Sequence, residues 1–283
     1  MSAAALWNRV WFRPAHPLCL TATRVIVSLQ ALWILLSRPD LPDLVRWPAE
    51  FFVLSGRALP ARFGIVVLPH AAEQALFFVL HAALLAAAAG LWARLSCFVS
   101  ALLLYHFAPF EEVIAGLPHT AFGGLTVPVL ALFVLSFAEA PRRRAAPSAE
   151  YRWPFALVQL LFAFSYFFPL LAKLRFSGPG WFTAENIRYY AMGNLGVTGA
   201  PLAAWVAERP LVCGAIALGT LALEGLSPLV VLRPAAAMAF VPAALVFHVG
   251  IVLVIGYFFP SLPLLLLLLD WDRIGRRLDR TGT

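Results

Sequence analysis

Residues 155–181 read FALVQLLFAFSYFFPLLAKLRFSGPGW, and this stretch decides the fold. Its first part is an apolar, aromatic-rich run of the length that crosses a bilayer as a helix, about 20 residues. The run ends at Lys173, and the SGPG segment at 177–180 then predicts a turn. A lysine at the end of such a helix either extends its ammonium to the lipid headgroups or, when desolvated, loses its proton near neutral pH and serves as a base. The role of Lys173 is therefore the main question about this chain.

The composition of the whole chain fits a membrane protein. Of its 283 residues, 62% are hydrophobic and only 12% are charged, and the mean hydropathy is +0.85. Soluble domains carry about 25% charged residues, so we expect a lipid environment rather than a nucleic-acid partner, in spite of a pI near 9.9. The three cysteines lie in separate apolar runs and form no CxxC motif, so we expect no metal site and no disulfide framework.

Apolar runs separated by charged or proline-rich segments predict an all-α fold, a polytopic membrane helix bundle with about eight transmembrane helices. Seven runs are long enough to cross a bilayer, and a leucine run near the C-terminus predicts a short eighth helix. The predicted spans are 18–37, 70–92, 95–110, 118–137, 153–174, 210–232 and 235–259, with 263–269 as the short eighth. The long segments 38–69 and 175–209 then lie outside the membrane.

The basic residues predict the orientation of this bundle. If all eight runs cross, the arginine-rich segments 142–144 and 273–280 and most of the 21 Lys and Arg residues fall on one side, together with both termini. Cytoplasmic loops of membrane proteins carry such an excess of Lys and Arg. We therefore expect a multi-pass protein of a bacterial cytoplasmic (inner) membrane, with its N- and C-termini in the cytoplasm.

Ionisable side chains inside the apolar runs are the candidate functional residues. A charge at mid-bilayer costs at least about 2.5–3.5 kcal/mol, so such groups face the bundle interior and pair with one another. The direction of each span places Lys173 in the outer half of the bundle, and Arg24 and Glu224 deeper, where we expect them to form a structural buried pair. The histidines that share the outer half are His70, His106, His119 and His248. A single histidine between helices is usually a structural hydrogen-bonding group, but their gathering on one side favours a functional site.

Three segments resemble the HTTM domain, the membrane module of vitamin K-dependent gamma-carboxylase. The segment YFFPLLAKLRFSGPGW (166–181) resembles the family's lysine-leucine segment followed by a tryptophan. The segment FHVGIVLVIGYF (247–258) resembles its Phe-His segment, and TRVIVSLQALW (23–33) is similar to its first helix. A further match is LPHTAFGG (117–124), where His119 falls near a histidine of the carboxylase.

This resemblance covers most of the chain and implies a single HTTM-like transmembrane domain over residues 1–283. In the carboxylase, a lysine deprotonates reduced vitamin K, which then reacts with oxygen to give the base that removes a proton from a peptide glutamate. Lys173 matches that lysine by position, so the resemblance implies Lys173 and His119 as catalytic residues and a reduced quinone as cofactor. The implied residues for binding the quinone or another substrate are His248, Trp181, Tyr166 and His106.

The chain departs from the carboxylase at two points. Arg175 follows Leu174 where the carboxylase has an acid, and we expect no extracytoplasmic peptide-binding domain in this chain. Glutamate carboxylation is therefore not implied. Three roles stay open: a quinone-linked carboxylase-like or oxidoreductase enzyme, non-enzymatic binding or transport of a lipid, a quinone or a secreted peptide, and a subunit that docks a partner protein.

Overall fold

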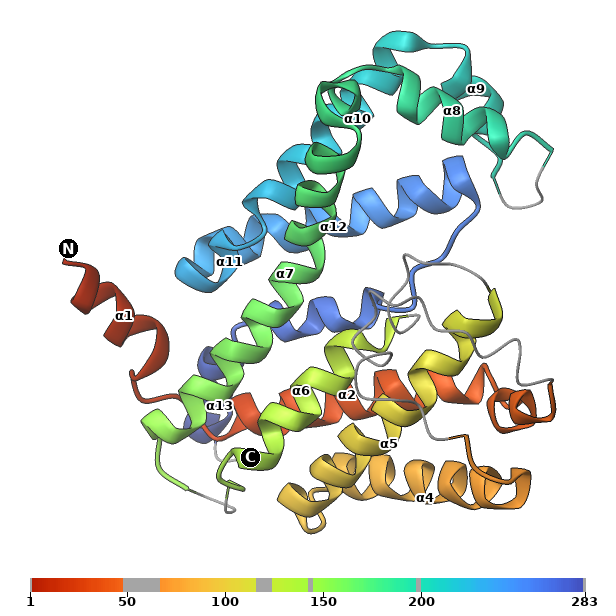
Figure 1. Ribbon diagram of the computed structural model, residues 1–283. Helices are drawn as coiled ribbons and strands as arrows, with labels where there is room; N and C mark the ends of the chain where they lie inside the picture. Colours follow the sequence, from red (N-terminus) through yellow and green to blue (C-terminus); the bar gives the residue numbers. More distant parts are fainter. Residues whose placement is uncertain (1, 48–66, 116–123, 142–144, 197–199, 282–283) are drawn as a thin grey trace. The chain divides into compact units, whose positions relative to one another are not determined.

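The computed structural model describes residues 2–47, 67–115, 124–141, 145–196 and 200–281. These segments are built from helices and contain no β-strand, which confirms the all-α prediction (Figure 1). The chain groups into two compact units, which are described separately. Unit 1 comprises residues 1–158 and 270–283, and unit 2 comprises residues 159–269. The prediction of a single domain stays a prediction, since such grouping does not measure independent folding.

In the part of the chain that the structure describes, four helices are long and apolar enough to cross a membrane. They are α2 (Leu18–Leu36), α4 (His70–Ala89), α7 (Arg152–Phe176) and α12 (Pro234–Ile255). Each agrees within a few residues with a predicted span, and each has a mean hydropathy between 1.6 and 2.5 over its most apolar stretch. The chain therefore has the helices of a multi-pass membrane protein.

The other predicted spans form helices that are short or, in the longest of them, have a shorter apolar stretch, Ala93–Ala108. These are α5 (Ala93–Ala115), α6 (Thr126–Phe137), α10 (Pro210–Leu226) and α11 (Leu229–Leu232). The predicted span 210–232 is thus interrupted between α10 and α11, where Pro228 has no N–H to continue the helical ladder. The leucine run forms a 3₁₀ helix, η6 (Leu262–Leu268), rather than an α-helix. A 3₁₀ helix rises about 2 Å per residue, so η6 alone does not cross about 30 Å of hydrocarbon.

Unit 1 is a bundle in which α5 packs against α4 and α6, and α2 packs against the same two helices. The 3₁₀ helix η1 (Leu41–Arg46) covers one end of α4. The bundle encloses the carboxylate of Glu73, which is fully buried. One oxygen of Glu73 pairs with His106 Nε2 at 2.8 Å, and the other accepts the Leu68 N–H at 2.9 Å. Both oxygens therefore have partners, as a buried acid requires.

Unit 2 contains most of α7, the 3₁₀ helix η5 (Gly178–Phe182), α8 (Glu185–Gly193), α9 (Ala203–Ala207), and α10 to η6. Residues from η5 and from α8 to α10 pack with Val254 of α12 around one apolar core. Two polar contacts tie other elements to α7. The Gln159 side chain donates to the Leu267 carbonyl at 2.8 Å, and the Ser227 hydroxyl donates to the Ala163 carbonyl at 2.9 Å.

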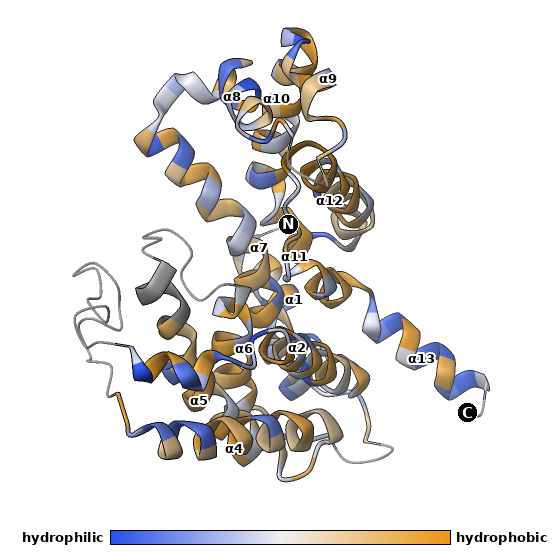
Figure 2. Cartoon of the chain, turned by 90° about the vertical axis from the view of Figure 1, so that its right-hand side faces the viewer, coloured by the Kyte–Doolittle hydropathy of each residue, from blue (hydrophilic) through white to orange (hydrophobic). Residues whose placement is uncertain are grey.

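Within unit 1, the C-terminal helix α13 (Trp271–Thr281) is held by the residues just before α2. The His16 N–H donates to Asp272 Oδ1 at 2.8 Å, and His16 Nε2 lies 3.1 Å from Asp279 Oδ2. Arg276 also donates to Asp272, at 2.8 Å. Figure 2 shows hydrophilic and hydrophobic residues alternating along α13. This helix is therefore amphipathic and fixed by charge-assisted hydrogen bonds.

We predict that acid releases α13. Burial alone would raise the pKa of the Asp272 carboxyl, but hydrogen bonds from Arg276 and from the His16 amide outweigh burial and hold that pKa below its usual value. Asp272 therefore stabilises the docked helix above the ordinary carboxyl pKa, and this contribution is lost as the pH falls through the lowered pKa. The protection factors of the α13 amides against hydrogen exchange should be high at neutral pH and should fall below about pH 4. Asp272→Asn should show low protection factors at neutral pH, with little further change in acid.

A second prediction concerns Gly275, which packs against the His16 ring. A Cβ at this position would lie 2.1 Å from His16 Nδ1, so one of the two elements must move. Gly275→Ala should destabilise the docking of α13 by about 1–3 kcal/mol, in spite of alanine's better helix propensity. Limited proteolysis near the C-terminus measures this. Gly214→Ala in α10 is the control, because a Cβ there meets nothing within 4 Å and should leave the cleavage rate unchanged.

Candidate functional site

Helix α7 carries two candidate residues on one face. Tyr166 and Lys173 are seven residues apart, which is about two helical turns and about 10 Å along the axis. Pro169, inside the helix, lies between them. Each of the two side chains meets a polar partner from another helix of unit 2, so α7 presents two polar pairs to the interior of this unit.

The first pair joins Lys173 to Glu224 of α10. The Lys173 ammonium donates to Glu224 Oε1, and the two side chains are only 17% and 5% exposed. The ammonium also lies 4.9 Å from the centre of the Trp181 ring, within the range of a cation–π contact. Lys173 therefore points into unit 2, where a carboxylate and an aromatic face surround its charge.

This pairing changes the expected chemistry of the lysine. In this geometry the amine is a hydrogen-bond donor to a carboxylate, whereas a general base needs its lone pair free toward the substrate. The second oxygen of Glu224, Oε2, is buried and has no hydrogen-bond partner among the described residues. Glu224 is thus the group of this pair that can accept a proton, and the Lys173 ammonium can stabilise a neighbouring anionic oxygen.

The second pair joins Tyr166 to His248 of α12. The tyrosine hydroxyl lies 2.7 Å from His248 Nε2, and both residues are buried. When Tyr166 donates this bond, the proton of the imidazole is on Nδ1. His248 Nδ1 is buried and has no partner among the described residues. His248 thus keeps one ring nitrogen that can donate or accept a hydrogen bond.

An apolar pocket of about 280 Å³ lies beside His248. Its other lining residues are Val249, Val252, Leu253, Phe258, Phe259 and Leu262. The volume is close to the lower end of the range for small-molecule sites, about 300–1,000 Å³. Its lining of aliphatic and aromatic side chains with one imidazole suits a flat, apolar ring that carries a polar substituent.

Four of the predicted site residues belong to unit 2: Lys173, Trp181, Tyr166 and His248. The structure brings Lys173 to Trp181 and Tyr166 to His248. His106 lies in unit 1, where it pairs with Glu73, and His119 lies outside the described residues. Their roles stay predictions.

The expected Arg24–Glu224 pair joins residues of two separately described units and also stays a prediction. Within its own unit, Glu224 is the partner of Lys173, which the sequence reasoning did not foresee. The rule that intramembrane charges pair, applied to Lys173 as well as to Arg24, would have made Glu224 a candidate partner for both.

Comparison of the chain with protein-family models, with curated proteins and with solved structures finds no match. The resemblance to the HTTM domain therefore stays a prediction. Among the described residues, no three His, Cys, Asp or Glu side chains gather in a way that could hold a metal ion.

We predict that the Lys173–Glu224 pair is energetically coupled. Glu224→Gln or Lys173→Met alone should lower the free energy of unfolding by about 3 kcal/mol, because each leaves a buried charge without its partner. The double variant should lose clearly less than the sum of the two single variants. Denaturant unfolding in detergent, followed by circular dichroism, measures all four proteins. Additive losses would contradict the pairing.

Proposed function

We propose that this chain is an HTTM-like membrane protein that binds a quinone beside His248 and takes part in quinone-linked oxidation and reduction. One observation carries the proposal. His248 is buried, bonded to Tyr166 through one nitrogen, left without a partner at the other, and placed on the wall of an apolar pocket. A quinone is an apolar ring with two carbonyl oxygens, so it matches a pocket that offers apolar walls and a single hydrogen-bonding group.

In this proposal, His248 and Tyr166 handle the protons that the quinone gains or loses. His248 Nδ1 would donate to a ring carbonyl, or accept from a ring hydroxyl in the other tautomer. The two tautomers interconvert when Tyr166 reverses the direction of its hydrogen bond to Nε2. The bound quinone would supply the two-electron chemistry, and the Tyr166–His248 pair would hold the proton that accompanies it.

The Lys173–Glu224 pair supplies the charged groups. Lys173 lies about two helical turns from Tyr166 along α7. Glu224 Oε2 would accept a proton, and the Lys173 ammonium would stabilise negative charge that develops on a substrate oxygen. This assigns Lys173 an electrostatic role in place of the role of a free base. The apolar surroundings of both pairs strengthen these interactions, since little water competes for them.

Two further observations support the HTTM-like assignment. The segments that resemble the family contribute Lys173, Trp181 and His248, and these lie within one compact unit. The positive charge of the predicted cytoplasmic segments supports eight crossings with both termini inside. In this proposal, the segment from the end of α12 through η6 returns the chain to the cytoplasm. Four of the seven η6 residues are buried, so protein rather than lipid surrounds much of this segment.

A non-enzymatic carrier of quinone or lipid is the second candidate. The near absence of polar groups in the pocket favours it, because apolar walls bind a ring without acting on it. The two functions differ in oxygen consumption when the reduced quinone is supplied. A carrier binds the hydroquinone and leaves the rate of oxygen uptake at the background value.

The test is a titration of the purified protein with a short-chain ubiquinone, followed by tryptophan fluorescence. The wild type should bind, and His248→Phe should bind about tenfold more weakly, because it keeps the aromatic ring but removes the hydrogen bond. His81→Phe is the matched control, since His81 belongs to unit 1 and bonds to the Phe77 carbonyl. Equal affinity of wild type and His248→Phe would overturn the proposed site. Oxygen uptake with the reduced quinone that Glu224→Gln abolishes would favour the enzyme over the carrier.

A further inference from the structure

Arg24 in α2 of unit 1 is a half-buried cation that has no counter-charge among the described residues of this unit. Its Nε is buried and has no hydrogen-bond partner among the described residues, and none of the ion pairs formed by these residues includes it. The guanidinium lies against the end of α4, where a Cβ added to Gly90 would be 2.8 Å from Nη2. Because an unpaired charge among apolar helices is costly, an anion from outside the described residues would stabilise Arg24.

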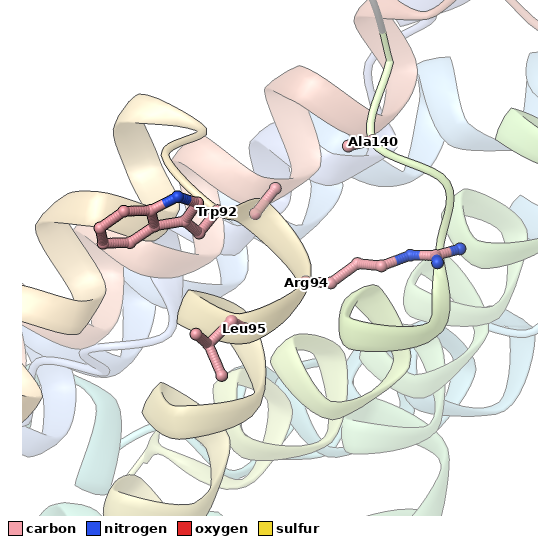
Figure 3. A pocket seen from close by; sticks show the side chains of 5 residues that line it. Trp92, Arg94, Leu95 and Ala140 are labelled. Carbon is pink, nitrogen blue, oxygen red and sulfur yellow. The ribbon is translucent and has the colours of Figure 1, made fainter.

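The space around Arg24 opens toward the surface of unit 1. Arg24, Cys97 and Glu139 line a small hollow at the start of α2 and the end of α6. The hollow shares Ala93 and Ala140 with a larger, open groove of about 470 Å³. The other residues of this groove are Trp92, Arg94 and Leu95 (Figure 3). A hollow lined by one guanidinium and one carboxylate therefore adjoins an apolar groove at the same end of the bundle.

The groove has the character of a lipid-facing surface. Trp92 is 83% exposed and Leu95 is 59% exposed. Figure 3 shows the Trp92 ring and the Arg94 guanidinium extending in opposite directions from the turn between α4 and α5. Arg94 is already engaged, because its Nε donates to the Ala138 carbonyl at 2.9 Å. Arg24, by contrast, donates none of the hydrogen bonds found among the described residues.

We propose that the groove binds one phospholipid, with its phosphodiester at the mouth of the hollow beside Arg24 and an acyl chain along Trp92 and Leu95. A guanidinium recognises phosphate oxygens with two parallel hydrogen bonds, and basic pockets between membrane helices bind lipid headgroups in this way. Tryptophan is enriched at the depth of the headgroups, where this end of the bundle would lie. In the eight-crossing topology, the site faces the cytoplasmic leaflet.

Glu139 restricts the kind of headgroup. Its side chain lines the hollow and is exposed to solvent, so its carboxylate lies at the rim. A headgroup with several negative charges would be repelled there. The site therefore fits a lipid whose charge is a single phosphodiester, such as phosphatidylglycerol.

The experiment measures lipid binding by native mass spectrometry of the protein in a neutral detergent. Dioleoyl-phosphatidylglycerol should bind the wild type, and Arg24→Gln should weaken this binding at least about tenfold. Arg273→Gln, which removes one positive charge from α13 outside the groove, should bind the lipid like the wild type. Dioleoylglycerol, which has the acyl chains but no phosphate, should bind equally weakly to wild type and Arg24→Gln.

Ala140→Leu is a second variant that keeps the test decisive if Arg24→Gln does not fold. Ala140 is exposed and lies where the hollow meets the groove, so a larger side chain blocks the passage without touching a charge. This variant should also lose phosphatidylglycerol binding about tenfold. The proposal is overturned if both variants bind the lipid like the wild type, or if inorganic phosphate alone binds in an Arg24-dependent way as tightly as the lipid does.

Discussion

The need to pair polar groups in an apolar interior governs this protein more than any other constraint. Water is scarce among helices whose surfaces are mostly leucine, alanine and phenylalanine, so an isolated ammonium, carboxylate or amide there is costly. Many of the described polar side chains meet this need with contacts between elements. Lys173 meets Glu224, Glu73 meets His106, and Gln159 bonds to the carbonyl of Leu267. Each of these contacts also fixes how one element lies against another.

Such polar contacts specify how two helices lie against each other, which apolar packing in lipid does not. Lipid tails are as apolar as leucine side chains, so helix association in a bilayer depends on close packing and on interhelical hydrogen bonds. A leucine face accepts several rotations of its neighbour, whereas the Tyr166–His248 bond at 2.7 Å accepts few. The hydrogen bonds that select one packing of the helices thus also bring together side chains that could take part in a reaction.

The sequence predicts where the helices lie along the chain, but it does not predict which side chains of different helices meet. The limits of α2, α4, α7 and α12 follow from hydrophobic length and from the glycines, prolines and charges that end each run, such as Gly90 after α4 and Gly256 after α12. The interruption at Pro228 was visible in the sequence but was absorbed into one long predicted span. The partner of Lys173 was not visible, because it depends on the rotation and depth of α10 relative to α7, and neither follows from hydropathy. For the same reason, the sequence paired Glu224 with Arg24, a residue of the other unit.

Pro169 gives the two polar pairs of α7 a mechanical relation. Pro169 has no N–H and cannot donate to the carbonyl of residue 165. One backbone hydrogen bond of α7 is therefore missing next to Tyr166, on the side toward Lys173. A helix bends most easily at such a point. The Tyr166–His248 pair holds the part of α7 before Pro169, and the Lys173–Glu224 pair holds the part after it. The bend angle at Pro169 sets the distance between the two pairs. A change in that angle would therefore change the distance between the Lys173 ammonium and the His248 imidazole.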